Sequence, residues 1–361
     1  MEERVFTEVK RLCYAGLDAA TLHRRALACL ARIVPFEGSC AHDADPASGF
    51  VTRMYLDPPH EQNLRVFLEH VYFEDEVNDF NWMIRARRPV ALLSQTTGGR
   101  LERSLRYRAA LAPRGFHFDL RAVFASGGSH WGGVSIFRER GRRDFSERDV
   151  TLISRLAPHL AAGLKGAALS AQASLASSDS GPGVLIIDER GQVVQFTASA
   201  ERWLRELGDL GPGWREGREL PPAIWLALGA LRHALKPASE RDTASVPHIM
   251  TQAPSGRWLR LQPALAESGD GGAGNTVIVI EPVGQHELAW LRTATYGLSA
   301  REREVVELVV RGASTKQIAA ALHIAESTVQ DHLSHIFDKV DVRSRRALVK
   351  RLYFDGLSPE R

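Results

Sequence analysis

The spacing of apolar residues changes along the chain and predicts different elements in successive parts. Near the N-terminus, apolar residues recur at the spacing of one helical face: Leu22, Ala26, Leu30 and Ile33. This spacing predicts an amphipathic helix. Farther along, residues 122–126 (AVFAS) and 132–139 (GGVSIFRE) have the composition of strands around a glycine-rich turn. Residues 1–145 are therefore expected to combine helices with an antiparallel sheet.

A second helical pattern begins after Phe145, with Ser146 in place to cap its first turn. Apolar residues then repeat alternately three and four positions apart: Val150, Ile153, Ala157, Leu160 and Leu164. Because this is heptad spacing, we interpret residues 146–180 as a linker helix and a candidate coiled coil between two copies of the chain. Pro158 interrupts the seam, and a proline inside a helix costs about 3 kcal/mol, so we expect a kink or break there.

Residues 181–284 show strand-like runs with one short helical stretch between them. VLIID and QVVQF flank a turn, and RWLRLQP and NTVIVIE flank a glycine-rich hairpin loop at 266–275. The helical stretch has one apolar face: Ala200, Trp203, Leu204 and Leu207. A small antiparallel sheet with helices on one face is the expected arrangement.

The last part, residues 298–361, is helical throughout and follows a linker helix predicted at 285–297. Ser299 with Glu302, and Ser314 with Gln317, have the spacing of helix-capping boxes. A helix over 314–322, a turn at 323–325 and a helix over 326–340 give helix-turn-helix geometry, although an ordinary helical bundle is the alternative. The last of these helices has one apolar stripe: Val329, Leu333, Ile336 and Val340.

Composition excludes some classes and leaves the nucleic-acid question to the local motifs. The chain of 361 residues is long enough for two or three domains, and its 44% hydrophobic and 25% charged residues are ordinary for a soluble protein. It has neither an apolar run long enough for a membrane span nor the apolar core of a signal peptide, so we expect a cytoplasmic location and no membrane contact. The net charge of +3 does not by itself indicate nucleic-acid binding. The cysteines, Cys13, Cys29 and Cys40, form no C-x-x-C pair and are expected to be buried or half-buried thiols.

No catalytic or metal-binding pattern survives inspection. GDGGAG at 269–274 is followed by a strand, whereas a dinucleotide site needs a helix there. His286 and Glu287 lack the second histidine of a zinc motif, since Trp290 occupies its position. Ser129 and His130 belong to a turn and do not form a nucleophile with its base. We therefore expect no enzyme activity, no metal and no cofactor.

The C-terminal motifs resemble the DNA-binding domain of the LuxR/GerE family, an all-α four-helix domain. The matching residues are Leu298, Arg301, Glu302, Glu304, Val305, Gly312, Ser314, Ile318, Ala319, Leu322, Thr328, Val329, His332, Lys339, Val342 and Arg345. The chain departs from the family pattern at three positions. Ala325 replaces the serine that usually caps the recognition helix, while Gln330 and Ser334 replace residues that are often basic.

This resemblance implies double-stranded DNA as a partner, with RNA polymerase as a further candidate. Glutamine can pair with adenine, and aspartate can accept from the cytosine amino group. The residues expected to read bases are Thr328, Gln330, Asp331, Ser334 and His335. Because the reading helix carries acids, affinity must come from phosphate contacts elsewhere. The candidates for those contacts are Ser314, Thr315, Lys316, Lys339, Arg343, Arg345 and Arg346.

Two upstream segments resemble sensor domains, so the expected fold class is α+β. Residues 111–164 are similar to the second half of a GAF domain, and 181–204 with the later strand pair is similar to a PAS domain. The acidic pair and strand-end aspartate of a phospho-receiver are not found. The first region also contains aromatic residues that are candidates for lining a ligand pocket, with core packing as the alternative for each: Tyr72, Trp82, Phe116, Phe118, Phe124 and Trp131.

These expectations combine into a homodimeric transcription regulator whose DNA binding responds to a small-molecule effector of unknown identity. One alternative is a DNA-binding regulator whose GAF-like and PAS-like domains bind no ligand and serve as a dimer scaffold or partner surface. The other is a cofactor-based sensor of light, redox state or gas.

Overall fold

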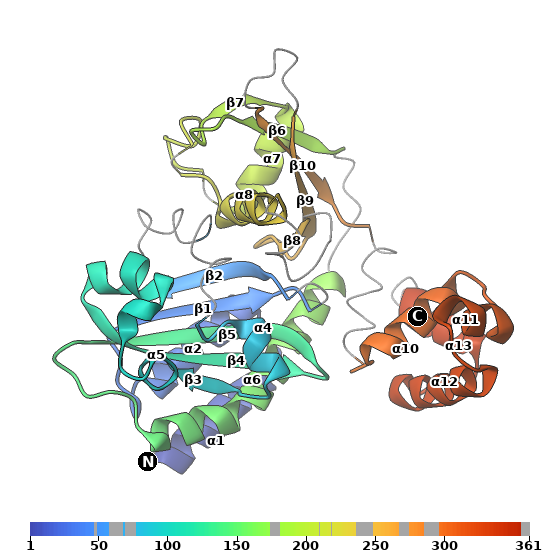
Figure 1. Cartoon of the computed structure of the whole chain (residues 1–361), viewed down its shortest axis with the longest axis horizontal. Helices are drawn as coiled ribbons and strands as arrows, with labels where there is room; N and C mark the ends of the chain where they lie inside the picture. Colours follow the sequence, from blue (N-terminus) through green and yellow to red (C-terminus); the bar gives the residue numbers. More distant parts are fainter. Residues whose placement is uncertain are drawn as a thin grey trace. The chain divides into compact units, whose positions relative to one another are not determined.

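The computed structural model describes residues 1–46, 49–57, 68, 77–173, 181–208, 210–217, 219–235, 248–266, 274–284 and 296–354. The chain divides into two compact units, Met1–Ala125 with His130–Val283, and Ser126–Ser129 with Gly284–Arg361. The first unit holds two five-stranded sheets and the second holds the C-terminal helices (Figure 1). The α+β class with antiparallel sheets is confirmed. Among the described residues, no helix combines the length and apolar character that crossing a membrane requires.

The first sheet has the strand order β2-β1-β5-β4-β3. Its strands are β1 (Gly38–Ala44), β2 (Val51–Asp57), β3 (Val90–Leu92), β4 (Phe116–Ser126) and β5 (Ser129–Glu139). The pairs β1–β2, β1–β5 and β3–β4 are antiparallel. Gly127 and Gly128, both with positive φ, make the turn between β4 and β5, so these strands are longer than the sequence predicts. Trp131 lies within β5 and not in the turn.

Helices cover both faces of this sheet. The His42 ring of β1 lies 4.4 Å from the ring of Phe80 in α4 (Phe80–Arg85), measured between centroids. The next residue, Asp43, binds His23 of α2 (Ala19–Leu30). Because successive strand residues point to opposite faces, α2 lies on one face and α4 on the other. Among the described residues of this region, the other short helices are α5 (Leu93–Thr97), η2 (Leu101–Arg103), η3 (Tyr107–Leu111) and η4 (Ala112–Arg114).

The long helix α6 (Glu147–Ala173) packs against α1 (Glu2–Cys13) and α2. The seam residues Ile153, Ala157, Leu160 and Leu164 are buried within the chain. A Cβ at Gly163 would lie 2.9 Å from the carbonyl oxygen of Cys13, which shows how closely α6 approaches α1. The interpretation of the seam as a contact between two chains is therefore not supported by its burial.

Pro158 lies inside α6, and the helix continues past it to Ala173. The expected break does not occur. Its neighbours Leu156 and Leu160, both large, are buried against the rest of the first unit, as are Ala157 and Ala161. Burial of apolar side chains contributes roughly 1.5–3 kcal/mol for each large one, which offsets the cost of the proline.

The second sheet has the order β7-β6-β10-β9-β8, which is the same arrangement as the first sheet when strands are counted from its own start. Its strands are β6 (Gly183–Ile187), β7 (Val193–Phe196), β8 (Ile249–Gln252), β9 (Trp258–Leu265) and β10 (Thr276–Pro282). The predicted pairs β6–β7 and β9–β10 are confirmed as antiparallel, and α7 (Ala198–Leu207) is the predicted helix. Helix α8 (Pro222–Ala234) and strand β8 were not predicted.

The sequence predicts separate domains at 1–145 and 181–284, but the contacts place both sheets in one unit. The Thr251 hydroxyl of β8 donates to the Thr52 carbonyl of β2 at 2.7 Å. Val51 at the start of β2 belongs to the same buried cluster as the second sheet's core. The sheets are therefore joined by backbone, side-chain and apolar contacts.

The C-terminal helices are α10 (Ala300–Val310), α11 (Thr315–Leu322), α12 (Glu326–Val340), α13 (Arg345–Val349) and the short π-helix η6 (Lys350–Phe354). Both predicted capping boxes, Ser299 with Glu302 and Ser314 with Gln317, are present. Ser344 caps α13 by accepting from the Ala347 amide. Most of the predicted linker helix at 285–297 lies outside the described residues.

Candidate DNA interface

Helix α12 has one buried side and one exposed side. Val329, Leu333, Ile336 and Val340 are buried in a cluster with residues of α10, α11 and α13, as predicted. Their spacing of three and four residues places them on one face of the helix. The opposite face is exposed and carries Gln330, Asp331, Ser334 and His335, whereas Thr328 is half-buried. We call these four exposed residues the reading face.

The turn between α11 and α12 is held in one conformation. His323 ends α11 with φ +54°, a left-handed conformation that is uncommon for a residue other than glycine. The Ile324 amide donates to the Ala319 carbonyl at 3.0 Å, which satisfies a free carbonyl at the helix end. Arg301 of α10 donates to the Leu322 carbonyl next to the turn. These contacts fix the direction in which α12 leaves α11.

Helix α12 begins without a side-chain cap. Ala325 occupies the N-cap position with extended backbone, and its side chain cannot accept a hydrogen bond. This is the departure that the sequence indicates at the recognition helix. It leaves the first-turn amides of α12 without the acceptor that a serine would supply, which typically costs about 1 kcal/mol.

The cations proposed to bind phosphate fall into two groups. Lys316, Arg343 and Arg346 are exposed and make no ion pair with the residues that the structure describes. Lys339 instead binds Glu302 of α10, with its Nζ 2.7 Å and 2.9 Å from the two carboxylate oxygens. Arg345 donates to the Ala313 carbonyl at 2.8 Å and to the Thr315 hydroxyl at 2.9 Å. The second group therefore has structural partners that the sequence analysis did not recognise.

The other proposed phosphate contacts also have local partners. The Ser314 hydroxyl caps α11, and the Thr315 hydroxyl accepts from Arg345. A phosphate role stays a prediction, and it is simplest for Lys316, Arg343 and Arg346, because phosphate binding there breaks no contact described within the chain.

Glu302 connects the capping box to the Lys339 ion pair. Burial raises the pKa of this carboxyl, but hydrogen bonds from Lys339 and Ser299 outweigh that effect and lower it below its usual value. The carboxylate is therefore charged at neutral pH and holds α12 against the start of α10. The Glu302 side chain is 5% exposed but that of Lys339 is 40% exposed, so solvent partly screens this pair.

Comparisons with known proteins place these helices in a family. The model described as "Bacterial regulatory proteins, luxR family" matches residues 297–352. The spore germination protein GerE of Bacillus subtilis (strain 168) is 46% identical over 55 residues, which are 15% of this chain and 74% of that protein. The chain belongs to the LuxR family.

Other LuxR-type relatives match only this C-terminal part. The monoamine regulon transcriptional regulator of Klebsiella aerogenes is 50% identical over 56 residues, which are 16% of this chain and 25% of that protein. The chain thus spans about a quarter of that regulator's length. The Klebsiella aerogenes relative is named as a transcriptional regulator.

Solved structures overlap with longer parts of this LuxR-family chain. A Vibrio cholera VqmA–ligand–DNA complex covers 52% of this chain and 86% of its own, at 18% identity and a TM-score of 0.23. The bacteriophytochrome RpBphP3 of R. palustris covers 77% of this chain and 62% of its own, at 13% identity and a TM-score of 0.30. Because both TM-scores are low, these overlaps support no conclusion about the upstream region.

Of the described aromatic residues proposed to line a pocket, none lines the larger cavity of the first unit and Trp131 lines a smaller one. Phe116 packs on Phe137, and Phe124 stacks on His23 of α2. Both are buried, as is Trp131, while Phe118 is half-buried and Trp82 is 37% exposed. Tyr72 lies outside the described residues. Phe116 and Phe124 pack against other rings, as the core-packing alternative expects, and a ligand role for these aromatic residues stays a prediction.

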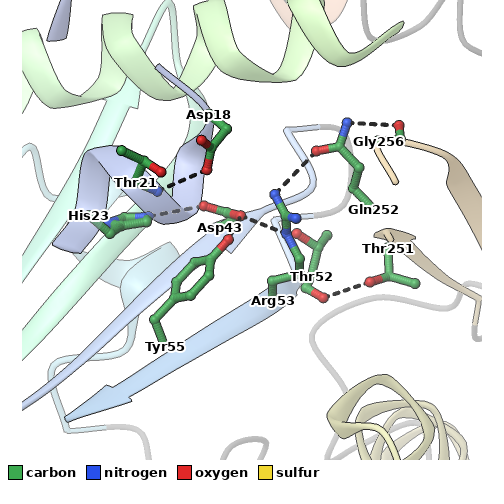
Figure 2. A network of polar contacts seen from close by, with 10 residues as sticks. All are labelled: Asp18, Thr21, His23, Asp43, Thr52, Arg53, Tyr55, Thr251, Gln252 and Gly256. Atoms are coloured by element: carbon green, nitrogen blue, oxygen red, sulfur yellow. Dashed lines mark hydrogen bonds and ion pairs between the residues drawn. The ribbon is translucent and has the colours of Figure 1, made fainter. Parts of the chain in front are cut away.

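The first sheet of this LuxR-family chain holds a buried polar network that its sequence does not predict (Figure 2). Asp43 of β1 accepts hydrogen bonds from Arg53 and Tyr55 of β2 and binds His23 of α2. These residues follow no motif. A weak signal is Asp43 itself, because a charged residue inside a strand that is otherwise buried needs partners.

The cysteine prediction is confirmed. Cys13 and Cys29 are buried, Cys40 is half-buried, and all are free thiols. Among the described residues, no cluster of histidine, cysteine or carboxylate side chains could hold a metal ion.

Proposed function

We propose that this chain is a sequence-specific DNA-binding transcriptional regulator that acts as a homodimer. The observation that carries the proposal is the reading face, exposed polar residues on a recognition helix whose other side is fully packed. An amide, an acid, a hydroxyl and an imidazole can each contact base edges in a major groove. Any surface helix carries polar residues on its outer side, so the support comes from this face together with the match of these helices to the LuxR family model.

The division of charge on the C-terminal unit supports separate roles for two groups of residues. Asp331 on the reading face repels phosphate but can accept from a cytosine amino group. The exposed cations Lys316, Arg343 and Arg346 supply the attraction to phosphate that such a helix lacks. Affinity then comes mainly from these cations, and base choice comes from α12.

A homodimer places two recognition helices about 34 Å apart, one turn of DNA. In the proposed mechanism, a small-molecule effector bound in the first unit changes how the two copies present these helices. Such coupling needs only 1–3 kcal/mol of difference in effector affinity between two poses, a typical value. A monomer in solution at micromolar concentration, with and without DNA, contradicts the dimer.

The two alternatives differ in measurable ways. A regulator whose sheets bind no ligand gives no thermal shift with any compound of a metabolite screen. A cofactor-based sensor of light, redox state or gas is coloured, or carries extra mass in native mass spectrometry as purified.

The decisive experiment selects bound duplexes from a random library and then titrates the selected and scrambled duplexes. Gln330→Ala is expected to lower affinity for the selected duplex by about 1–3 kcal/mol and to relax choice at one base pair. Lys316→Ala is expected to weaken both duplexes equally and to reduce the salt dependence. The matched controls are Gln195→Ala and Arg140→Ala, exposed residues of the first unit. An equal loss on both duplexes for Gln330→Ala contradicts its reading role.

A further inference from the structure

A cavity of about 410 Å³ lies between the two sheets of the first unit. Residues of β2 line one side of it, including Thr52, Arg53 and Tyr55, and Thr251 and Gln252 of β8 line another. This volume is near the lower end of the range for ligand sites, about 300–1,000 Å³, and it suits a small metabolite. Because both sheets contribute walls, an occupant contacts both at once.

Arg53 and Tyr55 of this lining belong to a hydrogen-bonded network whose centre, Asp43, lies behind the cavity wall (Figure 2). Asp43 binds His23 at 2.9 Å and accepts from Arg53 Nε at 3.0 Å and from the Tyr55 hydroxyl at 2.7 Å. Burial raises the pKa of Asp43, but its hydrogen bonds and the charges around it outweigh burial and lower it. The Asp43 carboxylate is thus ionised and fixes the position of the Arg53 guanidinium.

The outer edge of Arg53 is held only weakly. Its Nη2 donates to the Gln252 side-chain oxygen at 3.3 Å, longer than the usual 2.9–3.0 Å for such bonds. The acceptor is a neutral amide, whereas a guanidinium binds carboxylates more strongly and often through two parallel bonds. The side chain is 21% exposed. A ligand carboxylate can therefore displace Gln252 from this edge.

The start of α8 adds a second attraction for an anion. Pro221, Pro222 and Ala223 line the cavity, and because the two prolines lack an N–H, the Ala223 amide is the first donor at this helix end. The positive end of the helix dipole stabilises a nearby carboxylate. Arg53 and this helix end both favour a negatively charged group.

Asp18 lines the same cavity and supplies the opposite charge. One of its oxygens accepts from the Thr21 amide at 2.9 Å, where it caps α2. The charges of Asp18 and Arg53 each act on the other's pKa, so the two groups lie within electrostatic range. The remaining lining is apolar: Ala20, Met54, Leu207 and Pro254.

We propose that this cavity binds a small zwitterion with an apolar body, an α-amino acid with an apolar side chain, with its carboxylate on Arg53 and its ammonium on Asp18. The apolar side chain lies against Met54 and Leu207. Because the carboxylate replaces Gln252 on Arg53, binding removes one of the bonds that join the two sheets. This assigns the effector class and site, and it rests on the proposed function for its link to DNA binding.

The test is calorimetric titration of the full chain with L-alanine, L-valine, L-leucine, L-methionine and L-phenylalanine. The best of these is then compared with its analogues lacking either the amino or the carboxyl group. We expect each analogue to bind at least tenfold more weakly. An analogue without the amino group that binds as tightly as the amino acid overturns the role of Asp18, and no binding by any amino acid overturns the site.

Variants separate the site from general damage to the fold. Arg53→Gln and Asp18→Asn are expected to weaken binding at least tenfold, and asparagine still caps α2. Ala20→Met keeps both charges and the helix but fills the cavity, so it should also abolish binding. Arg205→Gln, an exposed residue of α7, is the control and should stay within twofold of the unchanged protein. Unchanged affinity in Ala20→Met overturns the location.

A parallel DNA titration with and without the amino acid distinguishes the two proposals. If the full chain binds no DNA, with or without the amino acid, the proposed function is contradicted but the proposed amino-acid site is not. An amino acid that binds in the calorimeter without changing DNA affinity overturns its role as the effector.

Discussion

The same substitution at two neighbouring arginines, Arg345 and Arg346, is expected to reduce two different properties, stability and DNA affinity. Arg345 binds the Ala313 carbonyl and the Thr315 hydroxyl, whereas Arg346 is exposed and makes no ion pair with the described residues. Arg345→Met should therefore destabilise the C-terminal unit, while Arg346→Met should weaken DNA binding. Methionine keeps an unbranched apolar stem in both cases, so the comparison isolates the guanidinium.

The loss at Arg345 follows from its contacts. Hydrogen bonds from a charged donor contribute about 1.5–3 kcal/mol each, and the half-exposed position reduces this value, so we expect about 2 kcal/mol in total. That corresponds to a decrease of about thirtyfold in the protection of buried amides against hydrogen exchange. The amides of Val329 and Ile336 in the full chain report it directly, since both residues are buried in α12.

The loss at Arg346 follows from counterion release. Each phosphate contact contributes about 0.9 to the slope of log affinity against log salt. The fold-loss in DNA affinity caused by Arg346→Met should therefore be about three times larger at 50 mM than at 200 mM salt. Amide protection in α12 should stay unchanged.

The reasoning is refuted if Arg345→Met leaves amide protection unchanged and reduces the salt slope as Arg346→Met does. That result means that Arg345 leaves its partners to bind phosphate. The Lys339 ion pair with Glu302 would then be open to the same reinterpretation.

Three further outcomes follow from burial and capping. Burial lowers the pKa of His130 to about 4 and also lowers that of His42, so both stay neutral in the folded state, whereas in the unfolded state they bind protons below the ordinary histidine pKa of 6.5. The free energy of unfolding should therefore fall by about 3 kcal/mol for His130 alone as the pH drops from above 6.5 to 4. In chemical denaturation, His130→Gln should flatten this pH profile. Ala325→Ser should stabilise the C-terminal unit by about 1 kcal/mol, seen as greater amide protection in α12, because serine supplies the missing cap. Burial raises the pKa of Cys13 and of Cys40 to about 12, so iodoacetamide at pH 8 should modify neither in the folded protein, and rapid alkylation of either contradicts its burial.

The features that the sequence predicts correctly are those that depend on local signals. Both capping boxes, the buried stripe of α12 and the strand pairs around short loops depend on residues close together in the chain. Helix α8 was not predicted, because residues Ala223 to Leu231 are all buried and the segment therefore lacks the three-to-four-residue apolar periodicity of an amphipathic helix. No period distinguishes such a segment from other apolar runs.

Side-chain roles that depend on distant partners could not be predicted. Arg345 and Arg346 are identical in type, and only the fold shows that Arg345 reaches back to Ala313. The network around Asp43 joins residues of α2, β1 and β2, and Arg53 meets Gln252 from the other sheet, 199 positions away. Neither spacing nor composition carries that information.

The position of α6 bears on how a homodimer of this kind can form. Its apolar seam is buried against α1 and α2, and its outer face carries Arg148, Thr151, Arg155 and Pro158. Arg148 already binds Glu2 of α1 at 2.6 Å. Charged residues and a proline do not form the knobs of a coiled coil, which are apolar. In the proposed homodimer, residues 148–158 of α6 therefore do not supply the apolar contact, and the proposed effector acts at the contact between the sheets, where Arg53 meets Gln252.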